Sequence, residues 1–244
     1  MIKFFRKIRQ NLLSEGKTGK YFKYAIGEIV LVVIGILIAL QINNWNEDRK
    51  KDELSKDYLL QLKQDLSLDT KLYEEQIYNL TNQLKQVDSA TIILEKPDAK
   101  LNTIQNIIIH GKIDSNIYDN YDINNNTFLA LQNSGNMNLI KKSVYKEVLD
   151  LNRAQKHYIR IIRDNSTTLQ EQSIKSFERL PSGGNSYLKE YFFAEFDWDK
   201  NSVNIVNTFY FMKRVNEGHI KVTKDILNQT NALKELITRE IENN

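Results

Sequence analysis

The longest apolar stretch of the chain runs from Tyr24 to Ile42, and its Ile29–Leu40 section contains only Ile, Leu, Val, Gly and Ala. A bilayer core about 30 Å thick is crossed by roughly 20 apolar helical residues, and Ile, Leu and Val each favour insertion. The single carboxylate of Glu28 lies about one turn inside the stretch, where a charge costs less than at the helix centre. The pattern predicts one transmembrane helix over residues 24–42.

After this stretch, apolar residues recur at helical spacing, and no alternating strand pattern competes with them. Residues 43–95 contain neither Gly nor Pro, and their apolar stripe is interrupted by a polar gap at Asp69, so one long amphipathic helix is predicted, which can continue from the membrane span. Further helices are predicted over Leu101–His110, Thr127–Gln132, Ser143 to about Leu180, part of Tyr187–Trp198, Ser202–Glu217 and His219–Glu240. The sequence therefore predicts an all-α chain, with an antiparallel helical bundle after the span.

Charge divides the chain into three parts: residues 1–23, the span 24–42, and residues 43–244. The first part carries seven Lys or Arg and one acid, Glu15, so a basic segment lies directly before the membrane helix. Such a segment is better explained by anionic lipid than by nucleic acid. Residues 1–13 fit an amphipathic helix in the headgroup region, with a disordered basic tail as the alternative. The residues predicted at the membrane interface are Phe5, Arg6, Arg9, Tyr21, Tyr24 and Trp45.

The basic residues before the span also predict its orientation. By the positive-inside rule, residues 1–23 lie in the cytoplasm and residues after about 43 lie outside it. A cleaved signal peptide is the alternative, but Ala39–Asn43 offers no small-residue cleavage site. An uncleaved signal anchor is therefore the favoured interpretation.

The sequence contains no recognisable catalytic or metal-binding pattern. There is no cysteine, and none of His110, His157 and His219 has a second ligand at zinc spacing, so each is predicted at a helix end or on the surface. The run from Asp122 to Asn133 resembles a calcium loop only in its opening residues and lacks the required Gly and Glu. We therefore predict no catalytic residue, cofactor or metal, and no enzymatic activity.

Two further patterns, one acidic and one of small residues, bear on function. Asp197-Trp198-Asp199 places two acids near an aromatic ring, which is more typical of a helix cap than of a catalytic pair. In the span, Glu28 shares a helical face with Gly35 and Ala39, and such a small-xxx-small pair allows another helix to approach closely. This face predicts a helix–helix contact with a protein partner or a second copy, and the alternative is a carboxyl group that only reaches toward the interface.

The segment Tyr24–Glu47, YAIGEIVLVVIGILIALQINNWNE, resembles the signature of a family of uncharacterised bacterial single-pass membrane proteins, a domain of unknown function. Phe5–Arg9 and the phrase Asn133-Ser134-Gly135 followed by Leu139-Ile140 also resemble that family. The resemblance implies a helical extracytoplasmic region anchored in the bacterial inner membrane. It implies no activity, substrate or catalytic residue.

These features favour a structural or accessory interaction module. A ligand-sensing domain is the alternative, and it would need a membrane partner because the 23 residues before the span are too few for an output domain. A pocket lined by polar groups would favour sensing, whereas a flat apolar patch would favour a protein partner.

Overall fold

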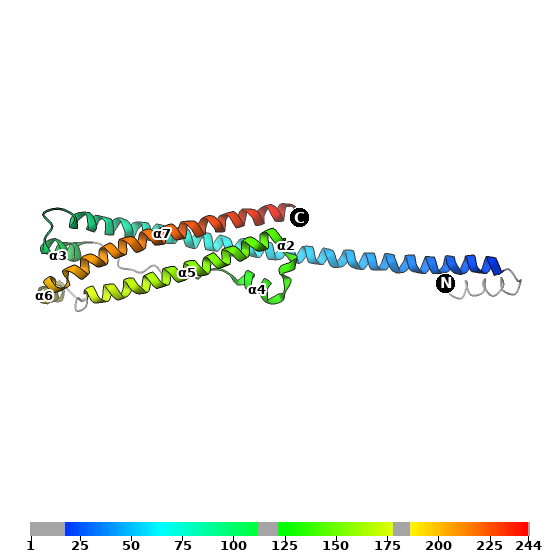
Figure 1. Ribbon diagram of the computed structural model, residues 1–244, viewed down its shortest axis with the longest axis horizontal. Helices are drawn as coiled ribbons and strands as arrows, with labels where there is room; N and C mark the ends of the chain where they lie inside the picture. The colour runs from blue at the N-terminus through cyan, green and yellow to red at the C-terminus, as the bar shows by residue number, and fades with distance from the viewer. Residues whose placement is uncertain (1–17, 112–121, 178–185, 244) are drawn as a thin grey trace. The chain divides into compact units, whose positions relative to one another are not determined.

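The computed structural model describes residues 18–111, 122–177 and 186–243, and these residues form helices joined by short connections, with no strand among them. The prediction of an all-α chain is confirmed for these ranges (Figure 1). The elements are α2 (Thr18–Leu94), α3 (Leu101–His110), α4 (Asn126–Ser134), the short 3-10 helix η1 (Asn136–Leu139), α5 (Lys142–Phe177), α6 (Ser186–Glu195) and α7 (Trp198–Asn243).

The chain forms two compact units, Met1–Lys56 and Asp57–Asn244, and α2 passes through both. In the first unit every side chain of Ile29–Leu40 is exposed. Among the described residues, α2 is the one helix that is long and apolar enough to cross a membrane, judged by length and composition alone. The following stretch is polar and is supported by contacts one turn apart, such as Asn43 to Glu47 at 2.9 Å and Arg49 to Glu53 at 3.8 Å.

The second unit contains three long helices, and hydrogen bonds between them give their directions. Asp69 and Gln76 of α2 contact Gln155 and Tyr158 of α5, so these two helices run in the same direction. Helix α7 runs opposite to both and lies beside α5 over much of its length (Figure 1). The antiparallel arrangement predicted from sequence thus describes α7 against its neighbours but not α2 against α5. The reason is that α3 joins the buried cluster of Val87 on α2, whereas α4 joins that of Leu59, so α5 begins beside the earlier part of α2.

The helices enclose two separate clusters of buried apolar side chains. Core 1 is formed by α2, α4, α5 and the second half of α7, and its members are Leu59, Leu62, Leu66, Tyr73, Phe128, Leu131, Ile140, Val144, Val148, Leu151, Tyr158, Ile162, Ile226, Leu233 and Ile237. Core 2 is formed by α2, α3, α5 and the first half of α7 with the residues before it, and its members are Val87, Ala90, Ile104, Ile107, Leu169, Phe196, Trp198, Ile205, Phe209, Met212 and Val215.

Several local predictions are confirmed. Helix α3 spans Leu101–His110 as predicted, and α4 covers the predicted helix Thr127–Gln132. The residue after α4, Gly135, adopts the left-handed region at φ 72°. Asp197 caps the start of α7, because its Oδ1 accepts a hydrogen bond from the backbone N–H of Lys200 at 3.0 Å. Phe196 and Trp198 are buried in core 2, whereas Tyr191 and Phe192 of α6 are exposed.

The predicted break near Gly218 is wrong, because α7 continues through it as one helix. A glycine costs a helix about 1 kcal/mol relative to alanine. Here the neighbours Val215, Asn216 and His219 are buried against the other helices, and this packing holds the backbone helical on both sides.

Candidate functional site

The most concentrated polar arrangement within the second unit surrounds Asp69 of α2, whose side chain is fully buried. Its Oδ1 accepts hydrogen bonds from the backbone N–H and the side-chain amide of Asn124, at 2.8 and 2.9 Å. Its Oδ2 accepts a hydrogen bond from the amide of Gln155 on α5 at 3.0 Å. The carboxylate therefore joins three segments that are distant in sequence.

A second carboxylate, one turn earlier on α2, holds the start of α4. Asp65 Oδ2 accepts a hydrogen bond from the backbone N–H of Thr127 at 3.0 Å, in the first turn of α4. This first turn carries N–H groups without an intrahelical partner, so a carboxylate there acts as a cap supplied by another helix. Asp65 and Asp69 together fix the start of α4 against α2.

The far end of α4 is held by Tyr58 of α2. Its hydroxyl accepts a hydrogen bond from the side-chain amide of Asn136 at 2.9 Å and lies 3.5 Å from the hydroxyl of Ser134. The left-handed backbone at Gly135 turns the chain between these two partners. Tyr58, Asp65 and Asp69 thus form one stripe of α2 that clamps α4 and η1, and we call them the clamp residues.

The polar contacts continue from Asp69 into the centre of the unit. The amide of Gln155 also donates to the hydroxyl of Tyr73 at 3.2 Å, and Tyr73 and Tyr158 pack edge to face with centroids 5.8 Å apart. The hydroxyl of Tyr158 donates to Gln76 at 2.9 Å and lies 3.2 Å from that of Thr223 on α7. Each of these hydroxyl groups is thus satisfied within the protein.

Burial raises the pKa values of the acidic groups in this cluster. It raises the pKa of Asp69, against the hydrogen bonds from Asn124 and Gln155, which lower it. It raises the pKa of Tyr73 well above its ordinary value and that of Tyr158 to about 12, so both phenols are neutral at physiological pH. The donors that reach Asp69 are all neutral amides. Within the described part of the chain, this carboxyl group is therefore held by amide donors and by no cation.

His219 contradicts the prediction that each histidine lies at a helix end or on the surface. It lies inside α7, is 2% exposed, and has its Nε2 3.3 Å from the side-chain amide of Asn165 on α5. Burial lowers its pKa to about 4, so the ring is neutral near pH 7. Among the described residues no group of three His, Cys, Asp or Glu side chains could hold a metal ion.

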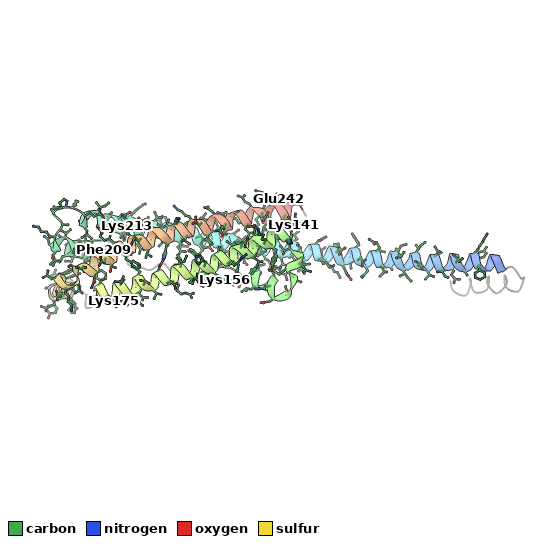
Figure 2. The ribbon with its side chains drawn as sticks, in the orientation of Figure 1. Lys141, Lys156, Lys175, Phe209, Lys213 and Glu242 are labelled. Carbon is green, nitrogen blue, oxygen red and sulfur yellow. The ribbon has the colours of Figure 1, made fainter. Side chains whose placement is uncertain are left out.

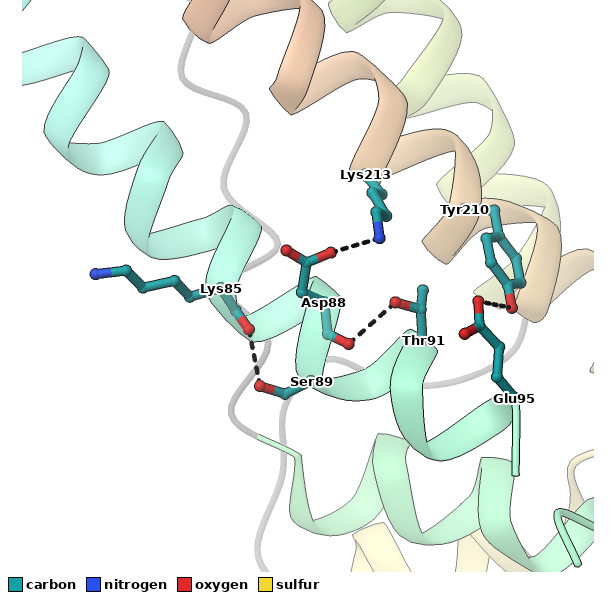
Figure 3. A network of polar contacts seen from close by, with 7 residues as sticks. All are labelled: Lys85, Asp88, Ser89, Thr91, Glu95, Tyr210 and Lys213. Carbon is teal, nitrogen blue, oxygen red and sulfur yellow. Dashed lines mark hydrogen bonds and ion pairs between the residues drawn. The ribbon is translucent and has the colours of Figure 1, made fainter. Parts of the chain in front are cut away.

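A further set of polar contacts ties α2 to α7 at the end of the unit that carries α3 and α6 (Figure 3). Lys213 lies 2.7 Å from Asp88, and this hydrogen bond raises the pKa of Lys213. The hydroxyl of Tyr210 donates to Glu95 at 3.2 Å. These are partly exposed links between helices, worth little individually in water, and they fix the register of α7 on α2.

The residues predicted for contact in the membrane lie on α2 of the first unit. Glu28 is half-exposed, Gly35 and Ala39 are exposed, and apart from the adjoining backbone of α2 no described atom lies within 4 Å of a Cβ built on Gly35. Of the predicted interface residues, Tyr24 and Trp45 are exposed, at 55% and 66%.

The structure does not describe the side chains of the remaining predicted interface residues. Phe5, Arg6 and Arg9, with the amphipathic segment 1–13, lie outside the described residues, and so does the side chain of Tyr21. The predicted end, at about Leu180, of the helix that begins at Ser143 also lies outside them.

Sequence comparison assigns the chain to a family. Residues 28–178 match the Family of unknown function (DUF6090). The chain belongs to this family. The matched range includes the clamp residues with the whole of α3, α4 and η1, and it also includes most of the apolar stretch, whereas α7 lies beyond it. No curated protein and no solved structure matches the chain.

Proposed function

We propose that this protein is a single-pass membrane protein of the bacterial inner membrane, with residues 1–23 in the cytoplasm and residues 43–244 outside it. It acts as a structural or accessory interaction module, without catalytic activity. The observation that carries the proposal is the exposure of every side chain of Ile29–Leu40. A helix that exposes apolar side chains on all its faces is stable in lipid and unfavourable in water.

The orientation is supported by the seven basic residues of the first 23. The test is the labelling of intact cells with a membrane-impermeant thiol reagent, since the chain has no cysteine of its own. We expect label on Lys156→Cys, an exposed position of α5, and none on Ser14→Cys until the membrane is permeabilised. Label on Ser14→Cys alone in intact cells would contradict the proposed orientation. Extraction of the protein from membranes by carbonate would contradict the proposed membrane anchor.

The partners we propose are membrane lipid and a second membrane helix, either of another protein or of a second copy. Support comes from the face that carries Glu28, Gly35 and Ala39, where the open space at Gly35 lets a helix backbone approach closely. The Glu28 side chain adds a hydrogen-bonding group to this face, and model systems place an interhelical hydrogen bond at about 0.6–2 kcal/mol.

A ligand-sensing role is the second candidate, and the buried polar groups around Asp69 and His219 are the observation that favours it. The two roles predict different results. An interaction module should retain a stoichiometric protein partner through purification in mild detergent. A sensor should melt at a higher temperature when its small ligand is added, because a ligand that binds only the folded state stabilises it.

A further inference from the structure

The two apolar cores share three long helices and differ in the short elements that join them. Core 1 includes Phe128 and Leu131 of α4, whereas core 2 includes Ile104 and Ile107 of α3 and Trp198 at the start of α7. Only α2, α5 and α7 contribute to both cores. Phe209, labelled in Figure 2, belongs to core 2 and lies toward the end of the unit that carries α3 and α6.

The three shared helices carry mainly polar side chains where they pass from one core to the other. Core 1 ends at Tyr73 on α2, and core 2 begins at Val87. The corresponding limits are Ile162 and Leu169 on α5, and Ile226 and Val215 on α7. Between these limits the buried side chains are Leu80 and six polar ones, which we call the polar layer: Gln76, Gln83, Ser166, Asn216, His219 and Thr223.

The polar layer supplies less buried apolar area than either core, although its side chains form hydrogen bonds between helices, such as those of Gln76 and Thr223 with Tyr158. Hydrophobic stabilisation scales with buried apolar area, and between the limits of the two cores Leu80 is the one buried apolar side chain, beside half-buried ones such as Val222. The amide nitrogen of Asn216 is buried without a hydrogen-bond partner among the described residues, which is an unfavourable state. His219 is held neutral by the same burial. The layer therefore interrupts the apolar packing between the two cores.

We propose that the polar layer divides the second unit into two parts that open separately, so that one core can unfold locally while the other stays folded. The division gives the unit a built-in point of conformational change at Gln83, Asn216 and His219. This inference does not depend on the proposed membrane role.

The test is native-state hydrogen exchange of the full chain in detergent micelles, read by mass spectrometry of peptides from each half of α7. Ile205 and Ile237 form a matched pair, because both are isoleucines of α7 with 0% exposure, one in each core. Replacement of either by valine removes one buried methylene and should speed exchange in its own core by about 2- to 13-fold.

Separate opening and opening as one unit predict different effects of these substitutions on the other core. If they open separately, exchange in the more easily opened core is unchanged by the substitution in the other core. If the unit opens as one, Ile205→Val and Ile237→Val each speed exchange by the same factor in both halves of α7, and the proposal is wrong.

A second variant tests the layer itself. Asn216→Leu places an apolar side chain between the cores, so exchange in the less protected core should slow toward that in the other. Asn228→Leu is the control, because Asn228 is exposed on the same helix and should leave both rates unchanged. Unchanged exchange in a folded Asn216→Leu protein would refute the layer as the boundary, and the isoleucine pair decides the question if this variant does not fold.

Discussion

Replacement of Asp69 by alanine removes the acceptor of three hydrogen bonds that join α2 to Asn124 and to α5. The side-chain amide of Gln155 keeps one acceptor, the hydroxyl of Tyr73 at 3.2 Å, so this amide loses only one of its two hydrogen bonds. The backbone N–H of Asn124 keeps no acceptor among the described contacts. An unsatisfied buried donor costs about 1–3 kcal/mol, and the space left by the carboxyl adds roughly 1 kcal/mol. We expect a total loss of about 2–4 kcal/mol.

The assay is thermal unfolding of the full chain in detergent micelles, followed by far-UV circular dichroism. For a unit of this size each kcal/mol shifts Tm by about 2–4 °C, so Asp69→Ala should lower Tm by roughly 4–16 °C. Asp69→Asn is the matched control. Its amide oxygen can still accept from Asn124 and its amide nitrogen can donate to a turned Gln155 side chain, so its stability should stay within about 1 kcal/mol of wild type.

The two variants also separate hydrogen bonding from charge. Because the folded-state pKa of Asp69 is raised above its unfolded value of about 3.9, the folded state binds the proton more tightly. The resulting stabilisation is fully present below the unfolded pKa and is lost as the pH rises through the folded pKa. Wild type should therefore gain stability relative to Asp69→Asn between pH 7 and pH 4. An Asp69→Ala protein that melts within 2 °C of wild type would refute this account of the cluster.

Three further predictions concern other parts of the chain. Gly218→Ala should raise stability by about 0.5–1 kcal/mol, since no atom lies within 4 Å of the new Cβ, whereas Gly135→Ala should lower it by about 1–2 kcal/mol because φ is 72°; opposite Tm shifts of the two variants check both. The fragment from residue 47 onward should be soluble and mainly helical by circular dichroism with a cooperative melt, and a fragment that needs detergent would contradict this. In the membrane, disulfide cross-linking through Ala25→Cys should occur and should weaken with Gly35→Leu, and cross-linking unchanged by Gly35→Leu would place the contact on another face.

Local features were predictable wherever the residue type dictates the backbone. Gly111 ends α3 where a Cβ would clash with the carbonyl oxygen of Ile107, and Gly135 adopts a conformation that other residues avoid. The cap at Asp197 follows from the same kind of local chemistry. Such signals act within one turn of the chain, so they are visible in sequence.

The break predicted at Gly218 failed because helix propensity is a weak local preference. Its cost of about 1 kcal/mol is smaller than the stabilisation from burying even one large apolar side chain nearby, such as Val215 or Met212. The direction of α5 relative to α2 was also not predictable. It depends on which core α3 and α4 each join, and no local pattern specifies this.

Asp69 shows how the sequence held more information than its hydropathy alone provides. It follows Leu62 and Leu66 and precedes Tyr73 at spacings of three and four residues, so it occupies the buried stripe of α2 and not a gap in it. A carboxyl group in such a register must be satisfied by donors from another element, because burial without hydrogen bonds is costly. His219 follows the same rule, four residues after Val215 and seven before Ile226. A polar residue in register with an apolar stripe therefore predicts a buried tertiary contact, and only its partner has to come from the structure.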